Sequence, residues 1–171
     1  MFSRDGTPLR TLHSAVPGNH DDPRVNLPGF VQPQLSSLGN RIAVSYPASG
    51  IVDIYDAGEL AQTVQLCMPP DLKSAYDRQL REVTANTRSQ QSIALISDVH
   101  LARQGEVSVI SLIKTQDGLL HVDQFAANGK PLGSIGLTST SPIPVRARFG
   151  ASSNRFLSIS GTGTLSLYAF D

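Results

Sequence analysis

The sequence predicts an all-β fold built from repeated antiparallel sheets, and two observations lead to this prediction. Short apolar stretches alternate with polar residues at the period of a β-strand, and turn signals separate them. In addition, one pattern recurs: an alternating strand, an aromatic residue, a glycine turn and a second strand. It occurs in full at residues 51–66 and 119–137, in truncated form at 2–12, and in part at 165–171.

Each full pattern predicts a β-hairpin. In the first of them, alternation places Val52 and Ile54 on one face of the leading strand. Ile51, Asp53 and Tyr55 then lie on the other face. The turns "DAGE" and "ANGK" supply glycine where a tight connection needs a positive φ, and Asn-Gly is a strong hairpin signal.

Two further strands precede each hairpin and the final partial pattern, so the repeating unit contains four short antiparallel strands. These preceding strands are expected at residues 31–40 and 41–47, 92–99 and 106–114, and 143–152 and 155–161. The aromatic residues Phe125 and Tyr168, which end third strands, are 43 residues apart. Blades of β-propellers repeat every 40 to 50 residues or so, about this distance. The sequence therefore predicts a partial β-propeller of about three blades.

A helical insert interrupts the repeat between Tyr55 and Phe125, which are 70 residues apart. The insert covers residues 69–88, and prolines at its start suit a first helical turn. Four apolar residues recur in it at helical spacing: Leu72, Tyr76, Leu80 and Val83. We expect one amphipathic helix near residues 71–85, which either caps the rim of the sheets or binds a partner.

The phrases "IYDAGEL" and "DQFAANGKPLGSIGL", with "SIALISD" after the helical insert, resemble bacterial six-bladed β-propellers of the NHL-like type. The resemblance covers residues 30–171 and rests on the repeat pattern, not on catalytic residues. It departs from that family because only two complete blades and one three-stranded blade are present. Since propellers use about 4 to 8 blades, we expect either the C-terminal half of a longer propeller or two copies that associate into one ring.

The predicted organisation is a single partial propeller domain across residues 1–171. Its expected parts are the outer strand of a preceding blade plus a loop (1–26), a blade (27–67), the helical insert (69–88), a second blade (91–138) and a three-stranded last blade (142–171).

Composition and charge argue against several classes of protein. Lys plus Arg equals Asp plus Glu at 14 each, so the chain lacks the basic excess of a general nucleic-acid binder. The sequence contains no run of 18 apolar residues, so it predicts no membrane-spanning helix. The start, "MFSRDGTPLR", has no apolar region of a secretory signal, whereas the family resemblance implies an extracytoplasmic parent. The single cysteine, Cys67, is expected at a strand end without a disulfide.

Two short motifs resemble metal-ligand boxes of calcineurin-like metallophosphoesterases. One contains Asn19, His20 and Asp21, and the other contains Asp98 and His100. That family places the Asp-x-His box first and adds a Gly-Asp-x-x-Asp box and later histidines, which are absent here. Four histidines in total do not fill the ligand set of two cations. We therefore predict no cofactor and interpret both motifs as turns. The alternative is a single divalent cation held by local oxygens of "NHDD", residues Asn19 to Asp22.

The remaining candidates lie on the predicted inner strand of the last blade and on the second hairpin. Arg146 and Arg148 share one face of that strand, so they either line the central channel for an anionic ligand or pair with carboxylates of adjacent blades. His121 is expected to face solvent or a neighbouring blade.

The sequence favours a non-catalytic binding module for an unidentified protein or small molecule. The alternative is a propeller-type lyase or lactonase with a metal in the channel, and a metallophosphoesterase is least favoured. No catalytic residue is assigned.

Overall fold

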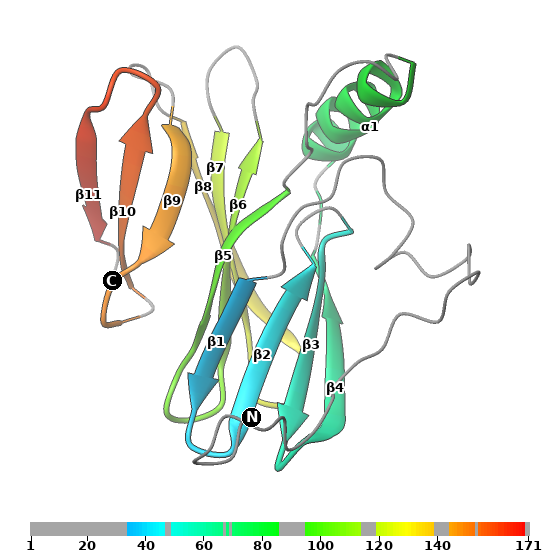
Figure 1. Cartoon of the computed structure of the whole chain (residues 1–171), viewed down its shortest axis with the longest axis vertical. Coiled ribbons are helices and arrows are strands. Elements are labelled where there is room, and N and C mark those ends of the chain that lie inside the picture. Colours follow the sequence, from blue (N-terminus) through cyan, green and yellow to red (C-terminus); the bar gives the residue numbers. More distant parts are fainter. Residues whose placement is uncertain are drawn as a thin grey trace, which may run out of the picture.

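The computed structural model describes residues 34–46, 49–66, 68, 70–85, 95–113, 119–138, 144–152 and 154–169. These residues contain eleven strands and one helix. Every strand pairing is antiparallel, and the strands form three separate sheets that follow one another along the chain (Figure 1). The predicted all-β class with one inserted helix is therefore confirmed.

The first two sheets each contain four strands in chain order. The first consists of β1 (Gln34–Leu38), β2 (Arg41–Tyr46), β3 (Ile51–Asp56) and β4 (Glu59–Gln65). The second consists of β5 (Ile96–Leu101), β6 (Val107–Ile113), β7 (Leu119–Phe125) and β8 (Pro131–Thr138). In the described residues the third sheet has three strands, β9 (Pro144–Phe149), β10 (Arg155–Ser160) and β11 (Leu165–Ala169).

The first strands of the three sheets lie side by side. Strand β1 contacts β5, and β5 contacts β9, while the later strands of each sheet extend outward in chain order (Figure 1). We call β1, β5 and β9 the inner strands. Because successive sheets pack face to face around these strands, the arrangement is that of a partial β-propeller.

Apolar side chains fill the two spaces between successive sheets. The cluster between the first and second sheets contains Ala43, Val52, Ile54, Val64, Val99, Leu101, Val107, Val109 and Phe125 among others. The cluster between the second and third sheets contains Ile110, Leu120, Val122, Ala147 and Phe156. Burying each aliphatic side chain stabilises the fold by about 1.5–3 kcal/mol before entropy costs.

Strand β3 is buried on both faces. Val52 and Ile54 point toward the second sheet, as the alternation predicts. On the opposite face, Ile51 and Tyr55 belong to a further buried cluster with residues of β2. A strand that is covered on both sides needs apolar residues at nearly every position, which explains the sequence "IVDIY".

Helix α1 (Pro70–Ala85) begins one residue before the predicted limit and lies at one end of the sheets (Figure 1). Ala75 and Tyr76 are buried in the cluster between the first and second sheets. This burial raises the pKa of the Tyr76 hydroxyl, and the charge of Asp77 adds to the effect. On the exposed side, Lys73 and Asp77 form an ion pair at 2.7 Å. No helix in the described part of the chain has the length and hydropathy of a membrane span.

The predicted turns have the backbone conformations that their sequences require. Between β3 and β4, Ala57 and Gly58 both have positive φ, at 47° and 87°, as the tightest hairpin turns demand. Between β7 and β8, Gly129 has a φ of 80°, and its N–H donates to the carbonyl of Ala126 at 2.8 Å. These turns fix the register of the outer strands.

Candidate functional site at the inner strands

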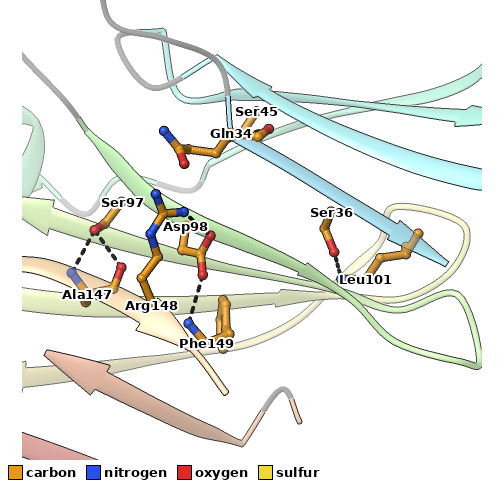
Figure 2. A network of polar contacts seen from close by, with 9 residues as sticks. All are labelled: Gln34, Ser36, Ser45, Ser97, Asp98, Leu101, Ala147, Arg148 and Phe149. Atoms are coloured by element: carbon orange, nitrogen blue, oxygen red, sulfur yellow. Dashed lines mark hydrogen bonds and ion pairs between the residues drawn. The ribbon is translucent and has the colours of Figure 1, made fainter. Parts of the chain in front are cut away.

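Side chains of β1 and β5 join the three inner strands through hydrogen bonds that involve backbone groups of the neighbouring strand. On one side, the Leu101 N–H donates to Ser36 Oγ of β1 at 3.0 Å. On the other side, Ser97 Oγ donates to the Ala147 carbonyl of β9 and accepts from the Ala147 N–H, both at 2.9 Å (Figure 2). Because these bonds satisfy backbone groups between sheets, the inner strands form one connected polar seam.

Asp98 makes the strongest contacts in this seam. The Arg148 guanidinium donates to its Oδ1 at 2.8 Å, and the Phe149 N–H donates to its Oδ2 at 2.8 Å (Figure 2). The ladder between β5 and β6 shifts register between Ile96 and Asp98, and such an irregularity re-aims the side chains beside it. Both carboxylate oxygens of Asp98 therefore bind groups of the neighbouring sheet.

His100 lies two residues further along β5, next to the ring of Phe149. The two ring centroids are 5.6 Å apart, and the rings are tilted by 47°. Burial lowers the pKa of His100, while the nearby Asp98 carboxylate acts in the opposite direction. The imidazole is consequently mostly neutral at pH 7.

The two arginines of β9 have different environments. Arg148 is paired with Asp98 of the neighbouring sheet and retains 38% side-chain exposure. Arg146 is exposed. The register of β9 against β10 places Arg146 opposite Ile159 and Arg148 opposite Leu157.

The other metal-ligand candidates lie outside the described residues. These are Asn19, His20 and Asp21, and Cys67 also lies outside. In the ranges that the structure describes, no three His, Cys, Asp or Glu side chains converge as a metal site.

A second polar cluster, which the sequence reasoning missed, lies between β7 and β8. His121 and Asp123 are 6% and 2% exposed, and His121 Nδ1 lies 3.3 Å from Asp123 Oδ1. The Ser134 hydroxyl is 2.7 Å from His121 Nε2 and 3.5 Å from Nδ1. The alternation in "LLHVDQF" was the available signal, because it places His121 and Asp123 on one face with Phe125.

This cluster contains the three residue types of a Ser-His-Asp catalytic triad, but its side chains are not aligned as in a triad. Because the Ser134 oxygen is within 3.5 Å of both ring nitrogens, it stands beside the ring and off the lone-pair axis of Nε2. A general base needs that axis to accept the hydroxyl proton. The cluster instead satisfies buried polar groups and ties β8 to β7.

No family model and no curated protein matches the chain. Among solved structures, BBS1N in complex with ARL6DN is 14% identical with a TM-score of 0.41, over 83% of this chain and 35% of that one. The computationally designed Ika4 protein is 14% identical with a TM-score of 0.30, over 85% and 96%. Kluyvelomyces marxianus Hsv2 is 11% identical with a TM-score of 0.26, over 83% and 65%.

This chain therefore spans little more than a third of the BBS1N chain. Its class is defined by its own sheets and inner strands, which make it a partial β-propeller-like protein.

Proposed function

We propose that this protein is a non-catalytic, propeller-like module that binds a partner protein through the exposed face of its third sheet. Four large apolar side chains lie on this face, which we call the third-sheet face: Leu157, Ile159, Leu165 and Leu167, at 49%, 37%, 69% and 69% exposure. They are cross-strand neighbours on β10 and β11. A contiguous exposed apolar surface of this kind marks interaction sites in soluble proteins.

The opposite face of the same sheet explains why these side chains remain outside. Phe156, Ser158 and Ser160 of β10 are buried toward the second sheet, and Phe156 stacks on Tyr168 at 4.8 Å. Strand alternation then directs the leucines and the isoleucine away from the core. The third-sheet face is exposed because the second sheet covers only the opposite face of the third sheet, while apolar residues occur on both faces.

The contacts of the charged side chains on the inner strands also favour a binding module over an enzyme. Asp98 directs both carboxylate oxygens to groups of β9, so it serves to hold the sheets together. Arg148, which would otherwise offer a positive charge to an anionic ligand, is the partner of that carboxylate.

The proposal includes the predicted domain organisation, in which residues 1–171 form one partial propeller. In this organisation, the partner at the third-sheet face is a separate protein, the other half of a six-bladed propeller, or a second copy of the chain. NHL-like repeats and an extracytoplasmic parent remain predictions of the family resemblance. The solution mass of the purified chain separates self-association from the other two arrangements.

The test is a comparison of captured proteins between two variants. Leu157→Asp places a charge in the third-sheet face, and Leu132→Asp, at a position on β8 that is 58% exposed, is the matched control. Each tagged protein is incubated with an extract of its source cells, and bound proteins are quantified by mass spectrometry. We expect proteins that are retained by wild type and Leu132→Asp to be lost from Leu157→Asp. Equal capture by all three would refute the proposal.

The alternative is a propeller-type lyase or lactonase with a channel metal, and a calcineurin-like metallophosphoesterase is a third, least favoured candidate. Calorimetric titration of the full chain with manganese, zinc and calcium separates these from a binding module. Saturable heat that disappears in His20→Ala or Asp98→Asn would favour a metal enzyme, and a flat titration favours the module.

A further inference from the structure

The two junctions between successive sheets use the same backbone contact. Leu101 of β5 and Phe149 of β9 are equivalent, because each pairs with the second-strand residue that lies opposite the aromatic residue of the third strand. The Leu101 N–H donates to Ser36 Oγ of β1. In the same way, the Phe149 N–H donates to Asp98 Oδ2 of β5 (Figure 2). At both junctions, the preceding inner strand therefore supplies a side-chain oxygen as the acceptor.

Strand β9 carries an arginine at the position of such an acceptor. Arg146 lies three residues before Phe149, which is the position of Asp98 in β5. It pairs with Ile159 of the third-sheet face, and cross-strand partners lie on the same face of a sheet. Arg146 is exposed, and a guanidinium donates hydrogen bonds but accepts none. The third-sheet face therefore offers a positive charge where the second sheet offers a carboxylate.

The apolar part of the third-sheet face corresponds to surfaces that are buried in the other two sheets. Three residues before the aromatic residue of the third strand, the three sheets have Val52, Val122 and Leu165. Val52 and Val122 are fully buried in the clusters that join their sheets to the following sheet, whereas Leu165 is 69% exposed. The occupant that matches this surface is therefore the apolar face of another sheet, since sheets pack through such faces.

Arg146 borders the apolar surface directly. Arg146, Ile159 and Leu165 lie opposite one another on three adjacent strands, which are about 4.8 Å apart in a sheet. A surface that covers Ile159 and Leu165 therefore reaches Arg146 as well. The described part of the third sheet, residues 144–152 and 154–169, contains no Asp or Glu. A carboxylate at the border of the incoming surface would pair with Arg146, whereas a positive charge there would be repelled.

A second copy of the chain does not supply a surface of this kind. Two third-sheet faces in contact would bring arginines but, within their described residues, no carboxylate to the interface. The outward face of the first sheet is not available either, because its apolar residues are at most 9% exposed. The occupant is therefore a sheet of a different protein.

We propose that the third-sheet face binds an antiparallel sheet of a partner protein whose apolar face is bordered by a carboxylate that pairs with Arg146. This inference rests on the proposed binding function and specifies the chemistry of the partner. The four apolar side chains of the third-sheet face supply affinity. The contact to Arg146 selects the partner and sets its orientation, as complementary charges do at interfaces.

The experiment uses a charge-reversed copy of the chain as a defined partner. Arg146→Glu keeps the apolar residues of the third-sheet face and borders them with a carboxylate. When the row Arg146, Ile159 and Leu165 of one copy lies on the same row of the other, the new carboxylate meets Arg146 and apolar residues meet apolar residues. The matched control is Arg103→Glu, which makes the same change of charge at an exposed position in the turn between β5 and β6.

Sedimentation velocity of equimolar mixtures measures the association. We expect wild type and Arg146→Glu to form a heterodimer, while each protein alone and the mixture of wild type with Arg103→Glu remain monomeric. Leu157→Asp in the wild-type partner should abolish the heterodimer, and Leu132→Asp should not. Circular dichroism of each variant verifies that the sheets remain folded.

A mixture of wild type and Arg146→Glu that stays monomeric would overturn the inference, and so would equal association of the Arg103→Glu control. A wild-type dimer that Leu157→Asp dissociates would also overturn it, because the occupant would then be a second copy.

The capture experiment described above separates this inference from the binding function. We expect Arg146→Glu to retain about a tenth or less of the proteins that wild type captures, and Arg103→Glu to retain them all. If Leu157→Asp abolishes capture while Arg146→Glu leaves it unchanged, the binding function stands and the paired carboxylate is excluded. If Leu157→Asp leaves capture unchanged, the binding function itself fails.

Discussion

Asp98 shows how one side chain can hold two sheets together without a hydrogen-bond ladder between them. It is 8% exposed, and both oxygens accept hydrogen bonds from β9, one from a side chain and one from a backbone N–H. Hydrogen bonds to a charged acceptor are stronger than neutral ones. The backbone contact also satisfies the Phe149 N–H, which would otherwise lose its partner.

The backbone contact of Asp98 should matter more than its ion pair. We expect Asp98→Ala to lower the free energy of unfolding by about 1–3 kcal/mol, because the Phe149 N–H loses its acceptor. Asp98→Asn keeps an acceptor oxygen and should cost clearly less, since Arg148 is 38% exposed and can be solvated. Urea denaturation of both variants measures the difference. Equal losses would mean that the ion pair carries the effect.

His100 gives a pH dependence with a defined sign. Its pKa is lowered in the folded state by burial, so the unfolded chain binds the proton more readily. Stability should therefore fall as the pH decreases through the ordinary value of about 6.5. In His100→Gln this part of the decrease should be absent. Thermal unfolding of both proteins between about pH 7.5 and 5.5 measures the difference, and parallel curves would contradict the assignment.

The contacts of individual side chains are the part of this structure that the sequence predicts least well. The face shared by Asp98 and His100 follows from strand alternation, but the partners of Asp98 are about fifty positions away along the chain. Such partners depend on how sheets are placed around the inner strands. His121 illustrates the same limit, because its exposure depends on whether Asp123 and Ser134 enclose it.

At the scale of elements, strands and turns are encoded locally. Helix α1 begins one residue from its predicted start, because proline and helical spacing act within a single segment. The turns of the two full hairpins have the positive φ angles that their glycines indicate. The irregularities in β4, β5, β8 and β9 were not predicted, since they arise from contacts between strands.

Gly129 should be one of the least replaceable residues of a hairpin. Its φ is 80°, and an added Cβ would meet the Gln62 side chain of the first sheet. We expect Gly129→Ala to lower stability by about 1–3 kcal/mol. Gly133→Ala is the matched control, because that position in β8 has no heavy atom within 4 Å of an added Cβ. Thermal melts of the two variants should differ, and equal melting temperatures would contradict a strained turn.

At the scale of the molecule, the two clusters between sheets make separate contributions. The cluster that joins the first and second sheets also includes residues of α1. The cluster that joins the second and third sheets depends on the fully buried Phe156. The three sheets follow one another in space as they do along the chain. The repeat pattern in the sequence therefore predicts their order. The asymmetry between a covered first sheet and an exposed third-sheet face does not follow from the repeat.

Phe156→Ala should loosen the third sheet before the other two. Removing a buried phenylalanine costs about 3–5 kcal/mol, a large fraction of the 5–15 kcal/mol or so that stabilises a typical domain. Because the cluster around α1 is left intact, amides of β9–β11 should lose protection from hydrogen exchange more than those of β2 and β3. Mass spectrometry of peptides after exchange measures this, and a uniform loss would indicate a single cooperative core.

The confinement of every hydrogen-bond ladder within one sheet has an evolutionary consequence. The described bonds between sheets come from side chains of Ser97 and Asp98 on β5, and from Ser36 on β1. A duplicated or deleted gene segment that encodes one whole sheet would therefore break no ladder. Such proteins could lengthen or shorten in units of a sheet, with only a small set of serine and aspartate positions to be restored at each new junction.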